Sequence, residues 1–320
     1  MTQLQENRIV AYLQSLGRDT ILTSWELIKI TVPVIIITKI LEECGLISTL
    51  STLLSPLMNL IGLPGELGLV WGTAMLTTLY GGLAVFAALA PSLDLNIAQV
   101  TVLCSAMLIA HSLPIELSIS KKSGVPLLPI LLLRVVGALC YCFILDRLCS
   151  ALGIWQQPAL LLFVVPAEKL SLGAWVLQQC LNIGLIIFII FCILLIMRVL
   201  RSVGVLGLLE RILTPVLPLF GMSGKMAPVT VVGMVMGISY GGALIIREIA
   251  AGKMSRAEVF NSMAMMGLCH GLVEDTLIMV AMGGRLGGIL WGRILFSLVV
   301  TFILVRLLKA LPERVSTRAS

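Results

Sequence analysis

The sequence predicts an all-α polytopic membrane protein, and composition and long apolar runs are the first two reasons. Hydrophobic residues make up 59% of the 320 residues, charged residues make up 12%, and the mean hydropathy is +1.09. Soluble domains contain about 25% charged residues, so a soluble core cannot absorb this much apolar surface. The runs 125–145 and 286–308 reach the roughly 20 residues that cross a bilayer as a helix.

An internal repeat is the third reason, and it sets the expected architecture. Tyr80-Gly81-Gly82 recurs as Tyr240-Gly241-Gly242 at an offset of 160 residues. Five further features recur at an offset of 159: Ser55-Pro56 as Thr214-Pro215, Gly62 as Gly221, Gly65 as Gly224, His111 as His270, and Arg134 as Arg293. The same order at a nearly constant spacing indicates a duplicated unit. The predicted domains are an N-terminal segment (1–24), a first repeat (25–150), a connector (151–175), a second repeat (176–310) and a tail (311–320).

Each repeat is expected to contain five elements in the same order. A first apolar helix (25–42 and 176–200) leads into a short interfacial helix that ends in Ser/Thr-Pro and Gly (45–62 and 204–221). A Gly-rich apolar stretch broken at Tyr-Gly-Gly follows (65–91 and 224–251). A helix interrupted by a His-containing motif (97–119 and 256–279) and a long uninterrupted helix (126–150 and 286–309) complete the repeat.

Basic residues indicate how each half crosses the membrane, because Lys and Arg collect on the cytoplasmic side. If the Gly-rich stretches cross, 12 of the 22 basic residues lie inside and 8 outside, which is a weak bias. If they are re-entrant hairpins, 16 lie inside, Arg134 and Arg293 lie within helices, and the outside keeps only Lys39, Arg147, Lys169 and Arg285. The hairpin model therefore satisfies the rule far better.

The hairpin model gives three spans per half, so the second half must be inverted relative to the first. The predicted fold is an inverted-repeat, transporter-like arrangement of six spanning helices, with two re-entrant hairpins and two broken helices. A bacterial-type inner membrane with both termini in the cytoplasm is the expected location. Residues 1–20 are polar and lack a signal-peptide pattern, and either a surface amphipathic helix or a disordered tail fits them.

Several function classes are excluded or left without support by the sequence. No Walker loop, HExxH or CxxC motif is present, so we expect neither an enzyme nor a primary pump, and no cofactor. The net charge of +6 follows from membrane topology rather than from nucleic-acid binding. The eight Cys indicate neither disulfides nor a zinc site, with Cys269 beside His270 as the one exception to watch.

The two Tyr-Gly-Gly breaks are the first candidate site. Adjacent glycines at a hairpin tip release the backbone from helical dihedrals and expose N–H and C=O groups that can hold a solute. Small residues also permit close helix packing, which is the structural alternative. Duplication favours the functional reading. The candidate residues are Thr77, Thr78, Tyr80, Gly81 and Gly82 in the first half, and Ser239, Tyr240, Gly241 and Gly242 in the second.

The two His motifs are the second candidate site. His111-Ser112-Leu113-Pro114-Ile115-Glu116 corresponds to His270-Gly271-Leu272-Val273-Glu274-Asp275, and the two His are the only ones in the chain. Pro and Gly weaken the helix there. Ionisable residues inside a membrane segment are functional candidates by default, although a position at the membrane surface would explain them too. The candidate substrate-binding residues are His111, Ser112, Glu116, His270, Glu274 and Asp275.

Arg134 and Arg293 lie at matched depths in the last helix of each half. We expect each to neutralise an acid of the neighbouring broken helix, namely Glu116 in the first half and Glu274 or Asp275 in the second. Attraction of an anionic substrate group is the alternative.

Through Tyr80-Gly81-Gly82, Tyr240-Gly241-Gly242 and the two His motifs, nearly the whole chain resembles the nucleoside-recognition or Gate-domain family of membrane proteins. That family includes spore maturation proteins A and B and the gate regions of ferrous-iron permeases, and its layout is similar to the core of concentrative nucleoside transporters. The resemblance implies that hairpin tips and broken helices meet around one solute. The polar residues with which nucleoside transporters hold base and ribose are not evident here, so nucleosides are not established as substrate by this resemblance.

Three functions remain open at this stage. The first is a carrier of a nucleoside-like solute or an organic anion, with Na+ or H+ as the expected coupling ion. The second is a divalent metal-ion permease, for which His111, Glu116, Cys269, His270 and Glu274 offer ligands without a diagnostic spacing. The third is a membrane scaffold or sensor. The expected partners are the solute or ion and the lipid bilayer, and association with further copies of the chain is left open.

The charge count makes a topological prediction. In a Cys-free background, single cysteines at Lys121 and Lys253 should react with a membrane-impermeant thiol reagent only from the cytoplasmic side, and one at Asp94 only from the outside. Labelling of position 121 from the outside would remove the inverted-repeat model.

Overall fold

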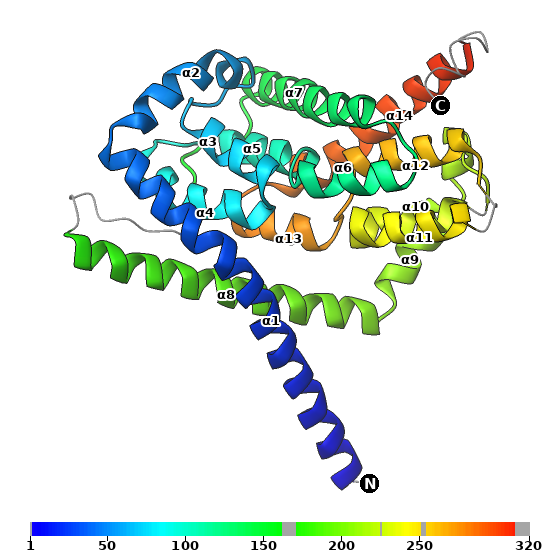
Figure 1. Ribbon diagram of the computed structural model, residues 1–320, viewed down its shortest axis with the longest axis horizontal. Coiled ribbons are helices and arrows are strands. Elements are labelled where there is room, and N and C mark those ends of the chain that lie inside the picture. Colours follow the sequence, from blue (N-terminus) through cyan, green and yellow to red (C-terminus); the bar gives the residue numbers. More distant parts are fainter. Residues whose placement is uncertain (1, 162–170, 225, 251–253, 311–320) are drawn as a thin grey trace.

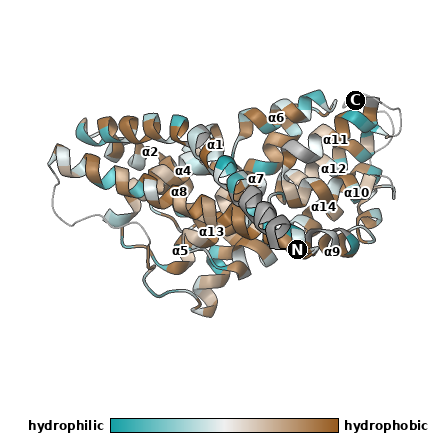
Figure 2. Ribbon diagram, turned by 90° about the horizontal axis from the view of Figure 1, so that it is seen from below, coloured by the Kyte–Doolittle hydropathy of each residue, from teal (hydrophilic) through white to brown (hydrophobic). Residues whose placement is uncertain are grey.

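The computed structural model describes residues 2–161, 171–224, 226–250 and 254–310. The side chains of residues 2–13, 26, 27, 206, 210, 239, 240 and 250 lie outside this description, as do the tail and part of the connector. Within the described ranges the secondary structure is helical, apart from an isolated bridge between Asn96 and Pro158. Hydrophobic residues predominate along these helices (Figure 2).

The first repeat contains all five expected elements, in the expected order. They are α1 (Thr2–Glu43), α2 (Leu46–Leu60), the pair α3 (Leu67–Leu76) and α4 (Leu79–Leu89), the pair α5 (Ile97–Ile109) and α6 (Leu113–Lys122), and α7 (Leu127–Leu152). A short 3-10 helix, η1 (Ala90–Ser92), follows α4. A capping box of Asn96 and Gln99 begins α5, and Gly153 in the left-handed conformation ends α7.

The second repeat follows the same order. It contains α8 (Leu172–Ser202), α9 (Val205–Leu213) with η2 (Leu217–Phe220), the pair α10 (Met226–Met236) and α11 (Ile238–Ala250), and the pair α12 (Arg256–Leu268) and α13 (Glu274–Ala281). The last helix starts as a π-helix, η3 (Gly287–Gly292), and continues as α14 (Arg293–Ala310). Ser255 and Glu258 form a capping box at the start of α12.

Five helices in the described ranges are long and apolar enough to span a membrane: residues 14–43 of α1, the broken helix α5–α6, α7, α8, and η3–α14. The sixth expected span is the broken helix α12–α13, which a wider gap interrupts. The chain is therefore a polytopic helical membrane protein in its architecture, whereas the inverted orientation and the re-entrant hairpins remain predictions.

The two halves meet along their broken and long helices. α5 packs against α7 of its own half and against η3 of the other half. Likewise, α12 packs against α14 of its own half and against α7 of the other. Exchanging the halves leaves this pattern unchanged, as expected for a two-fold relation. On the outside, α1 and α8 cross each other on one side of the molecule and α7 runs along the opposite side (Figure 1).

The N-terminal expectation is wrong in one respect. Residues 2–20 form neither a separate surface helix nor a disordered tail, because α1 continues without interruption from Thr2 to Glu43.

The position of the hairpin breaks is a second correction. Each break precedes the Tyr-Gly-Gly sequence: α3 ends at Leu76 and α4 is capped by the extended Thr78, while α10 ends at Met236, before Gly237, whose φ is +100°. The glycine pairs themselves lie in the first turns of α4 and α11. A Cβ at Gly82 would stand 2.7 Å from Cβ of Ala74, and one at Gly241 would stand 2.4 Å from Cα of Gly233. These glycines therefore let the two arms of each hairpin pack closely.

We predict that Gly241→Ala destabilises the protein by about 1–3 kcal/mol, because the new methyl group cannot fit against the Gly233 backbone. Gly72→Ala in α3 is the matched control, since nothing lies within 4 Å of the added Cβ and alanine favours a helix. Thermal unfolding in detergent should show a lower midpoint only for the first variant. Equal midpoints would contradict close packing of α10 on α11.

Candidate functional site

Two matched backbone breaks at the centre of the molecule create the candidate site. α5 ends at Ile109 and resumes as α6 after Ser112, whose φ is +47°. At the equivalent position of the second half, Gly271 has a φ of +56°. A Cβ at position 271 would stand 1.7 Å from Oδ2 of Asp275, so glycine also lets this carboxylate fold back over the break.

In each half, the helix break and the hairpin break are joined by a backbone hydrogen bond. The extended conformation at Thr78 leaves the carbonyl of Ala74 without its helical partner, and the N–H of Ser112 donates to that carbonyl at 2.9 Å. In the second half, the N–H of Leu272 donates to the carbonyl of Met234 at 3.0 Å. Non-helical backbone at membrane depth requires such partners.

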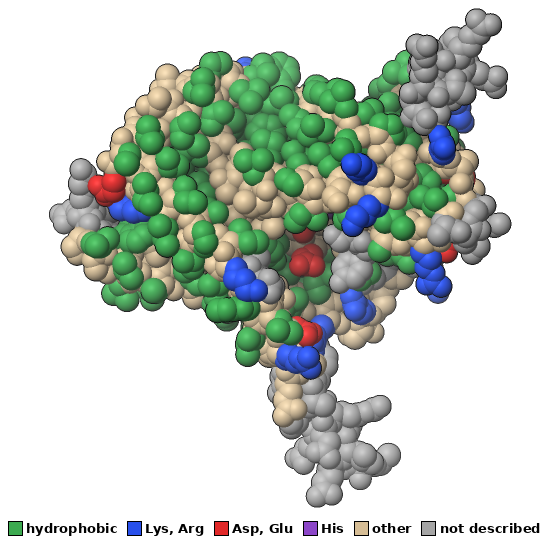
Figure 3. All heavy atoms as spheres, viewed as in Figure 1, with side chains coloured by type: hydrophobic (Ala, Val, Ile, Leu, Met, Phe, Trp, Pro, Cys, Tyr) green, Lys and Arg blue, Asp and Glu red, His purple; other side chains and the backbone are tan. Residues whose placement is uncertain are grey.

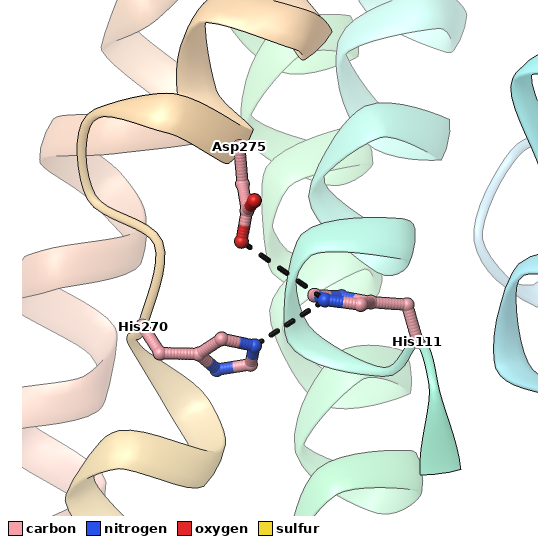
Figure 4. A group of neighbouring side chains, drawn as sticks. All are labelled: His111, His270 and Asp275. Carbon is pink, nitrogen blue, oxygen red and sulfur yellow. Dashed lines mark hydrogen bonds and ion pairs between the residues drawn. The ribbon is translucent and has the colours of Figure 1, made fainter. Parts of the chain in front are cut away.

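The two histidines of the chain face each other across the junction of the halves (Figure 4). Their Nε2 atoms lie 3.3 Å apart and their ring centroids 4.9 Å apart. Nδ1 of His111 lies 2.8 Å from the carbonyl oxygen of Met107, and Nδ1 of His270 lies 2.8 Å from that of Met266. Both side chains are almost fully buried. The sequence motifs thus come from two halves but form one site.

Carboxylates approach the same point from both halves. Oε1 of Glu116 lies 3.2 Å from Nε2 of His270 and 3.6 Å from Nε2 of His111. Oδ2 of Asp275 lies 4.0 Å from Nε2 of His111. Glu116 is buried, whereas the side chain of Asp275 is 19% exposed and Glu274 is half-buried. The site therefore combines two imidazoles and two carboxylates, and Asp275 is the carboxylate of the two that is within reach of the surface.

Arg134 connects the first broken helix to α7. It is fully buried, and its Nη1 forms the expected ion pair with Oε2 of Glu116. Its Nε donates to the carbonyl of Ile109 at 2.9 Å and its Nη2 to that of His111 at 3.0 Å. The indole of Trp71 donates to the carbonyl of Ala110, between these two. One guanidinium therefore binds the acid and also supplies donors for carbonyls that the break releases.

Arg293 departs from the expectation. It is equally buried and donates to the carbonyl of His270 at 3.1 Å and to Oγ1 of Thr276 at 3.3 Å, but no acidic side chain with described atoms lies within ion-pair distance. Its Nε lacks a hydrogen-bond partner. The expectation that Arg293 pairs with Glu274 or Asp275 is therefore wrong here. The polar groups at the second break therefore have fewer hydrogen-bond partners than those at the first.

The hairpin residues are distributed differently from what the sequence suggests. Thr77 donates to the carbonyl of Thr73, and Thr78 accepts from the N–H of Gly81, so both hydroxyls cap the first hairpin break. The side chain of Tyr80 is half-buried. Gly81, Gly82, Gly241 and Gly242 are buried packing positions. The side chains of Ser239 and Tyr240 lie outside the described residues.

The two halves close the site unequally. α6 packs against both hairpins, through α3 and α11, whereas α13 lies along α8 instead. A Cβ on Gly242 of α11 would stand only 2.2 Å from Cγ2 of Ile119 in α6. Acidic atoms lie at the bottom of a hollow in the apolar face where α13 runs (Figure 3). The site is thus sealed on the α6 side and more accessible on the α13 side.

Some contributors were not recognised in the sequence. The carbonyls of Met107 and Met266 bind Nδ1 of the two histidines. Trp71 donates to the carbonyl of Ala110 at the first break, and Thr276 accepts from Arg293 at the second. Each Met precedes its His by four residues, the ordinary helical hydrogen-bond spacing, which is the one signal that was available. Cys269 is buried beside His270, but it is not in the group of ligand atoms that lie within 4.8 Å of one another, which comprises His111, His270 and Asp275.

Comparison with known proteins supports the membrane assignment and goes no further. No family model matches the chain, and no solved structure matches it. The chain is similar to "Uncharacterized membrane protein YvoD" of Bacillus subtilis (strain 168), with 25% identity over 288 residues that cover 87% of this chain and 89% of the relative. The similarity thus spans both repeats and the site.

The Arg134–Glu116 pair makes a quantitative prediction. Arg134→Ala should cost about 3–5 kcal/mol, because it leaves a buried carboxylate unpaired. Combining it with Glu116→Gln should cost clearly less than the sum of the single changes. Arg293→Ala with Asp275→Asn is the matched control and should be closer to additive, since these side chains form no ion pair. Unfolding of all variants in detergent measures both cycles, and additivity at Arg134 and Glu116 would contradict the pair.

Proposed function

We propose that this membrane protein is a secondary transporter that carries a small solute across a bacterial-type inner membrane. One observation carries the proposal: two broken helices from equivalent positions of a duplicated chain place buried histidines and carboxylates at one central point. Broken segments at matching positions of two repeats are the best pointer to a transport site near the membrane midplane. A scaffold needs neither buried charge nor unwound backbone, and both are costly in a membrane.

The unequal closure of the site supports alternating access. In the present state α6 is packed against α11, while its counterpart α13 is packed on α8 rather than on α4. If the halves exchange these roles, α13 packs on α4. Ile278 then lies against Gly82, as Ile119 now lies against Gly242. Residues 119 and 278 are equivalent at the offset of 159 that relates the His motifs. The solute site would then open to the opposite side of the membrane.

The solute class follows from the site's chemistry. A nucleoside-like solute or an organic anion remains the first candidate, driven by a Na+ or H+ gradient, with both termini of the carrier in the cytoplasm. A second candidate, a divalent metal-ion permease, is favoured by the two imidazole nitrogens that face each other at 3.3 Å beside two carboxylates. A thermal-shift screen against nucleosides, organic anions and divalent metals separates the two, because a ligand stabilises the state that binds it.

A disulfide tests alternating access directly. A Cβ at position 242 would lie 3.7 Å from Cβ of Ile119, which is within the usual range of about 3.5–4.5 Å for a disulfide. In a Cys-free background, oxidation of Ile119→Cys/Gly242→Cys should abolish uptake of the screened solute into proteoliposomes, and reduction should restore it. The bond would hold α6 on α11 and prevent the exchange.

The matched control crosslinks two framework helices. Tyr141 of α7 and Phe296 of α14 have ring centroids 5.1 Å apart. The variant Tyr141→Cys/Phe296→Cys therefore joins two helices that keep their partners in the proposed movement. A bifunctional thiol reagent of matching length should crosslink that pair and leave uptake largely intact. Undiminished uptake by the oxidised 119–242 pair would contradict the proposed movement.

A further inference from the structure

We propose that the central site binds one divalent transition-metal ion, such as Zn2+ or Fe2+, through His111, His270, Glu116 and Asp275. The inference rests on the geometry of these side chains and not on the proposed transport function. It also goes beyond what the sequence indicated, because the sequence offered five possible ligands without a diagnostic spacing and did not include Asp275 among them.

The hydrogen bonds of the histidines fix which nitrogens are available. A backbone carbonyl can only accept, so Nδ1 of each ring must carry the proton that it donates to Met107 or Met266. In the neutral ring, Nε2 is then an unprotonated lone-pair donor. Two such lone pairs point at each other across 3.3 Å inside a buried site. That arrangement is repulsive unless a metal ion or a proton lies between them.

The spacing of the donor atoms matches one tetrahedral ion. Two ligand atoms at about 2.0–2.1 Å from a tetrahedral metal are about 3.4 Å apart. The three closest donors are Nε2 of His111, Nε2 of His270 and Oε1 of Glu116, and their separations are 3.2, 3.3 and 3.6 Å. Oδ2 of Asp275 is slightly farther, at 4.0 Å from His111. A small movement of this half-buried side chain completes four ligands.

The outer contacts are those that metal ligands usually have. Ligating histidines normally donate their other N–H to a carbonyl or a carboxylate, and ligating carboxylates are themselves hydrogen-bonded. Both histidines meet the first condition through Met107 and Met266. Glu116 meets the second, since Oε2 binds Arg134 while Oε1 faces the histidines. Ligand orientation is therefore already fixed by the fold.

The donor set also selects the class of ion. Imidazole favours Zn2+ and late first-row metals over Ca2+ and Mg2+, which prefer all-oxygen sites. Two carboxylates offset the charge of a divalent ion, and Arg134 reduces the net negative charge of the four side chains. Asp275, with 19% of its side chain exposed, is the ligand nearest to a path of entry.

A shared proton is the competing explanation. If one ring carried a second proton on Nε2, that N–H could reach the other imidazole or Glu116, and no metal would be needed. The two explanations differ in what metal addition does to the histidine nitrogens.

The test uses the full-length protein in detergent with any His tag removed, because the chain has only two histidines of its own. Titration calorimetry with Zn2+ should give one ion per chain. Co2+ should produce the intense visible absorption of a tetrahedral N/O site. In protein labelled with 15N-histidine, Zn2+ should shift both Nε2 resonances.

Variants and matched controls locate the ion. His111→Gln and His270→Gln should each weaken Zn2+ binding at least tenfold, and the double variant should abolish it. Replacing the exposed Cys44, Cys140 and Cys180 with Ser removes accessible thiols and should leave the affinity unchanged. Asp94→Asn removes an exposed carboxylate of the α4–α5 connection and should also leave it unchanged.

Three results would overturn the metal site: no binding by the wild type above a detergent blank, retained affinity in the double histidine variant, or histidine resonances that report a shared proton and ignore Zn2+. If the Gln variants do not fold, the wild-type Co2+ spectrum and 15N shifts still decide. Zn2+ binding without any transport would keep the site and reject the transporter, whereas transport without Zn2+ binding would do the reverse.

Discussion

The structure depends on one constraint, which is that backbone groups released inside a membrane must find partners within the protein. Each half breaks a hairpin and a neighbouring helix, and the carbonyl of one break accepts the N–H of the other, as Ala74 and Ser112 show. Arg134 and Trp71 then bind the carbonyls at the end of α5. These contacts let a chain rich in apolar residues hold two unwound segments side by side. The histidines meet because both segments end at the junction of the halves.

The two halves satisfy this constraint to different degrees. In the first, Arg134 binds two carbonyls and the buried Glu116. In the second, Arg293 binds one carbonyl and Thr276, and its Nε has no partner. The better-satisfied break is also the one whose following helix, α6, is packed between the hairpins. The half with an unmet donor carries the more accessible acid. In this structure the polar groups at the break of the first half therefore have more partners than those of the second.

Much of this architecture could be predicted from the sequence, because the apolar runs indicate each helix and the repeat indicates the same helix again in the other half. The expected broken helix at 97–119 corresponds to α5–α6 at 97–122, and the expected long helix at 126–150 to α7 at 127–152. The positions of the hairpin breaks could not be predicted, since a glycine pair is equally compatible with a turn and with a close helix contact. The residue that faces the pair, Ala74 or Gly233, distinguishes these two possibilities. The partner of Arg293 was missed because the side chain turns to a carbonyl, which no sequence pattern marks. The meeting of His111 with His270 depends on how two distant segments pack, and single-chain periodicity does not contain that information.

The position of the histidines at the junction between equivalent segments bears on how the site could have evolved. A ligand at such a junction is supplied once by each copy, so a half-length chain with a single histidine could have built the whole pair by associating with a second copy of itself. Fusion of two such copies into one chain would remove the requirement that both stay identical. Glu116 opposite Asp275, and Ser112 opposite Gly271, are the substitutions that such freedom permits. A centre that began with equal sides could in this way acquire a preferred direction.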